Sequence, residues 1–110
     1  MTRILIFGLC PLPFENTSKN YGPGIRAWQF IQPIIDAGHD VTLIAGRIPF
    51  IYPPETPPEM RIVDRGFTTY HLADSLFHDP QRIQEIHDRF DPDCILCATI
   101  FATPPAAALT

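Results

Sequence analysis

Residues 25–45 read IRAWQFIQPIIDAGHDVTLIA and join a helical pattern to a strand pattern across a three-residue turn. In the first part, apolar residues recur at intervals of three and four, which is typical of a helix with one buried face. Gly38 comes next, and glycine readily adopts the left-handed conformation that closes many helices. Residues 41–45 form a mainly apolar run, typical of a strand buried on both faces. The whole stretch predicts a helical crossover leading to a strand that lies parallel to an earlier one.

The earlier strand is predicted at residues 4–7, a continuous apolar run that ends at Gly8. A long loop, residues 10–24, separates it from the helix, and loops of that length in a compact domain are usually functional. Further along the chain, four segments have strand or helix patterns: 60–64, 67–72, a helix beginning at Asp79-Pro80, and 94–98. We expect one of the first two to be the third strand. The order of elements predicts an α/β fold with a Rossmann-like, doubly wound and mainly parallel sheet.

Length and composition limit the domain organisation and the classes of partner. The 110 residues include 13 prolines, and 8 basic side chains stand against 12 acidic ones, for a net charge of −4. This length fits one domain, residues 1–110, and leaves no room for a second. The acidic balance argues against electrostatic binding of nucleic acid or an anionic membrane, which needs clustered basic residues.

The cysteine count and the apolar segments indicate a cytoplasmic protein. Three cysteines do not make a disulfide framework, so a reducing compartment is expected. The apolar start lacks a cleavage site before Cys10 and runs into Pro11 and Pro13, which argues against a signal peptide. The stretch from Cys94 to Thr110 is interrupted by prolines and is too short for a membrane span. We therefore expect no transmembrane segment.

The segment Asn20-Tyr21-Gly22-Pro23-Gly24-Ile25-Arg26 is the strongest candidate for a binding site. It lies between the first strand and the first helix, where ligands bind in open α/β sheets. Gly22 and Gly24 allow close approach of backbone amides to an anion, and the helix expected from Ile25 points its free N–H groups at it. Arg26 opposes the helix dipole, which favours an anionic ligand nearby. The alternative is a simple glycine turn with a solvated arginine, paired with Glu15.

A nicotinamide-dependent reductase stays open as a minor alternative. Gly22, Gly24 and Ala27 have the spacing of the dinucleotide-binding fingerprint, although 13 residues separate Gly22 from Gly8 at the strand end. No acidic residue ends the second strand, but Arg47 follows it and suits the 2′-phosphate of NADP.

The remaining chemistry-bearing residues do not form a recognisable site. Cys94 and Cys97 have the spacing of a metal or redox pair, but residues three apart in a strand face opposite sides, so we expect both to be buried apolar side chains. His39 is expected to order the turn between helix and strand. The other histidines lack a spacing that converges on a metal: His71, His78 and His87. Three aspartates are expected to cap a helix or to be solvated: Asp88, Asp91 and Asp93. No metal and no cofactor are expected.

Two motifs, Gly22-Pro23-Gly24-Ile25-Arg26 and Gly38-His39-Asp40-Val41-Thr42-Leu43, follow an amino-terminal apolar strand in the order seen in one enzyme family. In both motifs and over essentially its whole length, the chain resembles the amino-terminal domain of family 4 glycosyltransferases of the GT-B fold. The resemblance implies two domains facing a cleft and transfer of a sugar from a nucleotide-sugar donor to an acceptor, with retention of configuration and without a required metal. It also implies that the amino-terminal domain shapes the acceptor side, while its glycine loop, here Gly22 and Gly24, lies against the donor diphosphate, with Arg26 as an anion contact.

Two departures from the family pattern limit what is carried over. Many relatives have a histidine in the loop after the fourth strand, where this chain has Thr99-Ile100-Phe101-Ala102-Thr103, so no catalytic residue is assigned. The carboxy-terminal domain with most of the donor contacts is absent from these residues. We therefore expect a truncated transferase, inactive alone; the alternative is a stand-alone binding module or the partner of a separate domain.

Overall fold

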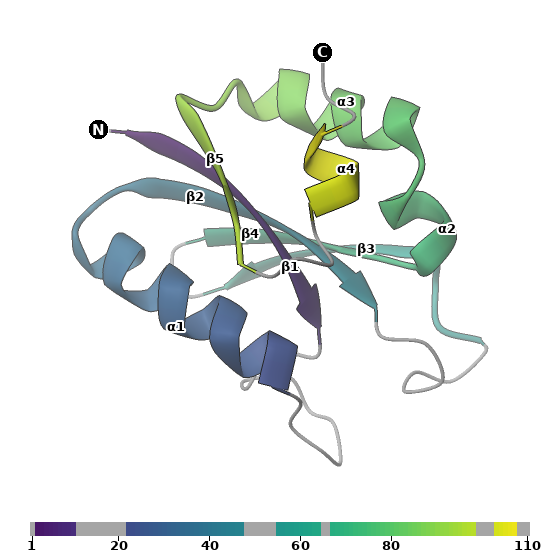
Figure 1. The fold of residues 1–110 in the computed structure, drawn as a ribbon, viewed down its shortest axis with the longest axis horizontal. Helices are drawn as coiled ribbons and strands as arrows, with labels where there is room; N and C mark the ends of the chain where they lie inside the picture. Colours follow the sequence, from purple (N-terminus) through teal and green to yellow (C-terminus); the bar gives the residue numbers. More distant parts are fainter. Residues whose placement is uncertain (1, 11–21, 48–54, 65–66, 99–102, 108–110) are drawn as a thin grey trace.

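The computed structural model describes residues 2–10, 22–47, 55–64, 67–98 and 103–107 (Figure 1). Within these ranges, five strands form one sheet: β1 (Arg3–Cys10), β2 (Asp40–Arg47), β3 (Glu59–Asp64), β4 (Phe67–Leu72) and β5 (Cys94–Cys97). Four helices accompany them: α1 (Gly22–Asp36), α2 (Asp74–Phe77), α3 (Pro80–Phe90) and α4 (Thr103–Ala107). The helix α2 and the start of α1 at Gly22 differ from the sequence prediction.

The sheet has the strand order β3-β4-β2-β1-β5, with β4, β2 and β1 in its interior and β3 and β5 at its edges. β1 lies parallel to both β2 and β5, and β2 lies parallel to β4. The β1–β2 pairing runs from Arg3 opposite Asp40 to Cys10 opposite Arg47. β3 runs antiparallel to β4 at one edge.

The prediction of a Rossmann-like, doubly wound fold is wrong, although three of the four strand pairings are parallel. The sheet is mixed, because both candidate strands are present and form an antiparallel hairpin, β3 and β4. Only residues 65–66 connect these two strands, whereas parallel neighbours need a crossover of about a dozen residues or more. Among the described helices, α2 and α4 span only 4 and 5 residues, so the clear helical layers of a doubly wound fold are not seen. The structure thus does not show half of a GT-B fold.

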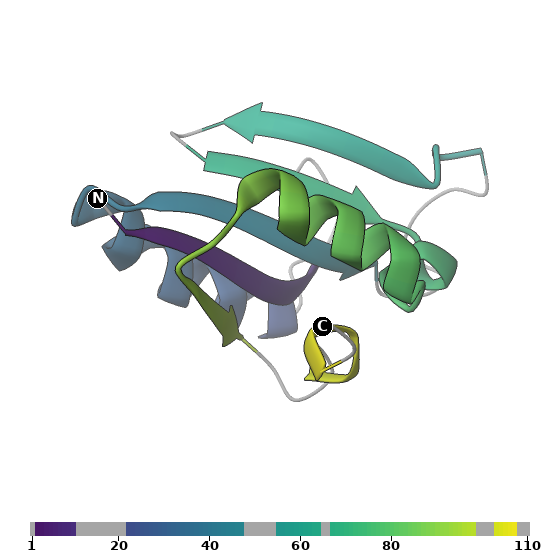
Figure 2. The ribbon, with the colours of Figure 1, turned by 90° about the horizontal axis from the view of Figure 1, so that it is seen from above.

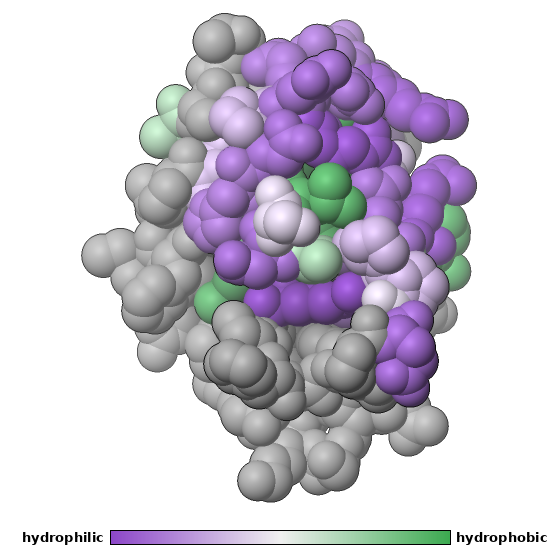
Figure 3. All heavy atoms as spheres, turned by 90° about the vertical axis from the view of Figure 1, so that its right-hand side faces the viewer, coloured by the Kyte–Doolittle hydropathy of each residue, from purple (hydrophilic) through white to green (hydrophobic). Residues whose placement is uncertain are grey.

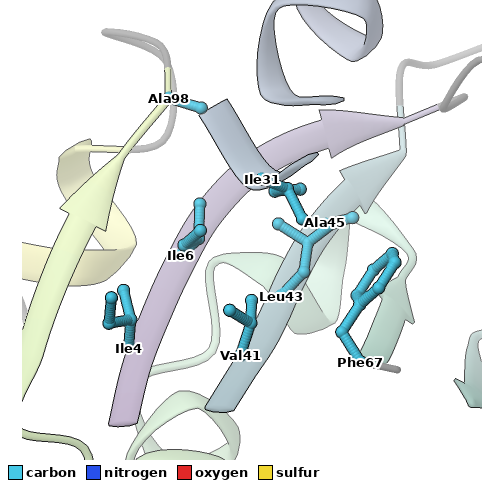
Figure 4. Close-up of a cluster of buried hydrophobic side chains, with 8 residues drawn as sticks. All are labelled: Ile4, Ile6, Ile31, Val41, Leu43, Ala45, Phe67 and Ala98. Atoms are coloured by element: carbon cyan, nitrogen blue, oxygen red, sulfur yellow. The ribbon is translucent and has the colours of Figure 1, made fainter. Parts of the chain in front are cut away.

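Apolar side chains on the two faces of the sheet make two separate core clusters. On one face, Ile31 of α1 packs with residues of β1, β2 and β4 (Figure 4). On the other face, Phe77, Ile83 and Ile86 from α2 and α3 pack on the alternate residues of the same strands. Figure 2 shows α1 and α3 on opposite sides of the sheet. The alternation of side chains along each strand therefore supplies both cores.

The helix ends follow the local chemistry expected from the sequence. Gly38 has φ 89° just after α1, as a glycine cap requires. The side chain of Asp79 accepts a hydrogen bond from the amide of Gln81, and Pro80 occupies the first turn of α3. Asp91 closes α3 with a left-handed φ of 54°. These predictions are confirmed, because they depend on a few neighbouring residues only.

Replacement of Gly46 by alanine is expected to destabilise the fold. A Cβ atom at Gly46 would lie 2.6 to 2.8 Å from ring atoms of Phe77, which is buried between α2 and the sheet. Overpacking of this kind costs about 1–3 kcal/mol of unfolding free energy. Chemical denaturation measures the loss. In a Phe77→Leu background, the same Gly46→Ala change should cost less, and an equal cost in both backgrounds would contradict the steric explanation.

Candidate functional site

The candidate site lies at the end of the sheet where the parallel strands β1, β2 and β4 terminate. Ligands of open α/β sheets bind outside this carboxyl-terminal edge. Figure 3 shows the side of the molecule toward which β2 and β4 point, and the described residues there are mostly hydrophilic around a small apolar area. Because α1 connects the end of β1 with the start of β2, its first turn lies at this edge as well.

The three predicted site residues, Gly22, Gly24 and Arg26, all lie in the first five residues of α1. The helix begins at Gly22 and not at Ile25, so the two glycines belong to the helix start and not to a preceding loop. Pro23 is compatible with this start, because the first N–H groups of a helix have no partner within it. The side-chain surroundings of Gly22, Gly24 and Arg26, and the loop 11–21 with Glu15, lie outside the described residues.

A buried pair, Arg47 and His71, joins the ends of β2 and β4. Nε of Arg47 donates a hydrogen bond to Nδ1 of His71 over 2.8 Å. His71 is 0% exposed and Arg47 is 9% exposed. The β2–β4 register puts His71 opposite Ala45, two residues before Arg47 on the same face of the sheet. Sequence spacing missed this pair, because 24 residues separate its members.

The hydrogen bond selects one tautomer of the neutral His71 ring. Nδ1 accepts from a guanidinium and so carries no proton, which leaves the proton of the neutral ring on Nε2. The second guanidinium arm of Arg47, through Nη2, donates to the carbonyl of Pro57. In addition, the amide of Ala73 donates to the carbonyl of Pro58 over 2.8 Å. Arg47 and these backbone bonds therefore hold the segment before β3 against the edge of the sheet.

This internal role of Arg47 bears on the reductase alternative. Binding of the 2′-phosphate of NADP needs a guanidinium directed at the ligand. The Arg47 guanidinium is buried and contacts His71 and Pro57 instead. Arg47 therefore does not support a nicotinamide site.

An ion pair between Arg82 and Glu59 fixes α3 to β3 at the same edge. Nε and Nη2 of Arg82 contact the two carboxylate oxygens of Glu59, each over 2.6 Å. Nη1 of Arg82 also reaches Glu85 over 3.0 Å. The hydrogen bonds with Glu59 raise the pKa of Arg82 above its usual value. The bidentate geometry makes this pair a positional restraint rather than a catalytic acid or base.

The cysteines and the remaining histidines do not form a site in the described part of the chain. Cys94 and Cys97 are exposed, and the prediction that both are buried is wrong, because β5 is an edge strand of the sheet. Two histidines lie beside neighbouring carboxylates: His78 beside Asp74 at 3.5 Å and His87 beside Asp88 at 2.9 Å. The hydrogen bond from His87 lowers the pKa of the exposed Asp88. No group of three or more His, Cys, Asp or Glu residues within the described ranges is arranged to hold a metal ion.

No helix among residues 22–36, 74–77, 80–90 and 103–107 is long and apolar enough to cross a membrane.

Replacement of His71 by phenylalanine tests the buried pair. Phenylalanine fills the ring's space but leaves Nε of Arg47 without its acceptor, so the free energy of unfolding should fall by about 1.5–3 kcal/mol. His71→Gln retains a carbonyl oxygen as acceptor and should lose less. A double-mutant cycle with Arg47→Met measures the coupling. Additive losses in that cycle would show that the two side chains do not support each other.

Comparisons with known proteins give no relative for this chain. Searches against protein-family models, curated protein sequences and solved structures find no match.

Proposed function

We propose that this chain is the amino-terminal, acceptor-side part of a retaining glycosyltransferase similar to family 4, acting in the cytoplasm on a nucleotide-sugar donor. The observation that carries the proposal is the place of Gly22-Pro23-Gly24-Ile25-Arg26, which forms the first turn of α1 after the interior parallel strand β1. The proposal rests on these residues and on the sequence resemblance, and not on the class of the fold.

The start of α1 has the properties that binding of a diphosphate requires. The first N–H groups of a helix lack partners within it, and the helix dipole adds positive potential there. With glycine at positions 22 and 24, no Cβ keeps a ligand away from the backbone. In the proposed complex, these amides face the donor diphosphate and Arg26 supplies a guanidinium to the same anion.

The neighbouring part of the edge is held in place by internal contacts. Arg47 connects β2 with His71 of β4 and with the segment before β3, and Arg82 connects α3 with Glu59 of β3. A binding surface built on restrained elements holds a substrate in a narrower range of positions. We assign positioning of the acceptor to this edge and no catalytic residue to the chain.

The reaction needs groups that these residues do not supply. The bond between the anomeric carbon and the diphosphate oxygen breaks, a bond from that carbon to an acceptor oxygen forms, and the acceptor proton passes to a base. Stabilisation of the departing diphosphate requires donors on both sides of it. We therefore propose a second domain, on this polypeptide or a separate one, as the obligatory partner.

The 110-residue chain alone is expected to show no turnover of nucleotide sugars, because only one side of the proposed cleft is present. A radiolabelled-transfer assay with a panel of UDP-, GDP- and ADP-sugars measures this. Turnover by the isolated chain would overturn the requirement for a second domain. Saturable binding without turnover, even with that domain present, would instead favour a stand-alone binding module.

Arg26→Ala in the complete enzyme is expected to lower kcat/KM for the nucleotide sugar by about tenfold or more, because one charge-assisted hydrogen bond to the diphosphate is lost. Gln29→Ala, an exposed position one turn along α1, is the control. Unchanged kinetics in Arg26→Ala would show that Arg26 is a solvated side chain that does not contact the diphosphate.

A further inference from the structure

A small pocket lies at the opposite end of the sheet, where β1, β2 and β4 begin. Its volume is about 230 Å³, below the roughly 300–1,000 Å³ typical of pockets for drug-sized ligands. It is near the amino terminus marked in Figure 1 and away from the start of α1. The proposed transferase function does not use this pocket.

Residues from five elements, β1, β2, β3, β4 and α3, line the pocket, and the sheet register explains why those of the strands meet. Thr42 of β2 lies opposite Thr68 of β4, and Arg61 of β3 lies opposite Tyr70 of β4. These side chains all project from the face that α3 covers, because residues opposite each other in a sheet share a face. The last residues of α3, with Arg89, close the pocket from above.

Three of the chain's seven arginines line this one pocket, and a single carboxylate accompanies them. Nε of Arg3 lies 3.6 Å from Asp40, and its guanidinium carbon lies 5.0 Å from the ring centre of Phe90. Arg61 and Arg89 are exposed, and neither has a carboxylate within 4.0 Å among the described residues. The pocket is thus positively charged in a chain whose net charge is −4.

The helix dipole explains only one of these arginines. A cation in the last turn of a helix is favourable, and Arg89 has that position in α3. Arg3 and Arg61 come from different strands, where no such dipole acts, and like charges that share a concavity repel each other. An anion in the pocket removes that repulsion.

We propose that this pocket binds a small ligand carrying a dianionic phosphate group. The planar guanidinium matches phosphate oxygens in bidentate geometry, and the hydroxyls of Thr42, Thr68 and Tyr70 line the same pocket as hydrogen-bond donors. The guanidinium carbon of Arg82 lies 5.9 Å from the Tyr70 ring centre, and this cation–π contact helps to hold the Tyr70 ring in place. The small volume and the acidic surface of the chain favour a compact phosphate over a polyanion.

Calorimetric titration of the whole chain with inorganic phosphate and with a hexose phosphate tests the proposal. The titration is performed at low ionic strength, because salt screens exposed arginines. We expect saturable binding of at least one of the two phosphates, and the comparison shows whether the pocket takes free phosphate or a phosphorylated sugar. In amide NMR spectra, the shifts should concentrate on residues 3, 40–42, 61, 68–70 and 89.

Two substitutions and two controls separate specific binding from a general charge effect. Arg61→Gln and Arg89→Gln remove exposed guanidiniums and should each weaken binding about tenfold. Gln81→Glu lowers the net charge equally at the far end of α3 and should leave affinity within about twofold. Gln29→Glu makes the same change of charge on an exposed face of α1 and should also leave affinity within about twofold.

Three outcomes would overturn the proposal: no saturable binding of either phosphate, equal weakening by Gln81→Glu, or NMR spectra in which residues 3, 40–42, 61, 68–70 and 89 do not shift. Tighter binding of malonate than of phosphate would also overturn it, because the site would then select a dicarboxylate. Circular dichroism confirms that the variants are folded. Loss of this binding leaves the transferase proposal untouched, since the two sites are at opposite ends of the sheet.

Discussion

The rest of the structure depends on the burial of β1 and β2 on both faces of the sheet. Leu5, Ile6, Phe7, Leu43 and Ile44 have no exposed surface. A strand buried in this way needs hydrogen-bonded neighbours for its backbone, since unpaired buried N–H and C=O groups are costly. β4 and β5 provide these neighbours on the outer sides of the β1–β2 pair. Helices on each face then complete the burial of the alternating side chains.

The two ends of the sheet differ in how their charges are used. At the carboxyl-terminal edge, Arg47 and Arg82 bind internal partners and restrain the segments around β3. At the amino-terminal edge, Arg61 and Arg89 point into a solvent-accessible pocket without an ion-pair partner among the described residues. Of these four arginines, Arg61 and Arg89 are available to bind an external anion. Charge counts along the sequence do not distinguish the two kinds.

Sequence reasoning was most accurate where neighbouring residues decide the structure. Gly38, Asp79 and Asp91 end or begin helices through contacts with residues a few positions away. It was wrong for Cys94 and Cys97, because burial depends on whether a strand is central or at an edge. It also treated residues 60–64 and 67–72 as alternatives for one strand. The two segments are joined by residues 65–66 alone, and so short a connection indicates two strands paired as an antiparallel hairpin.

The sequence alone determined the strands β1 and β2, the helices α1 and α3, the end of α1 and both ends of α3, since apolar periodicity and capping chemistry are local properties. It also singled out Gly22, Gly24 and Arg26, which stand together in seven residues of sequence. The tertiary structure decided the strand order, the mixed character of the sheet, the Arg47–His71 pair and the arginine pocket. Arg3, Arg61 and Arg89 lie far apart in the chain and meet only because strand register and the direction of α3 bring them together. Such contacts follow from the pairing of distant segments, which no local pattern specifies.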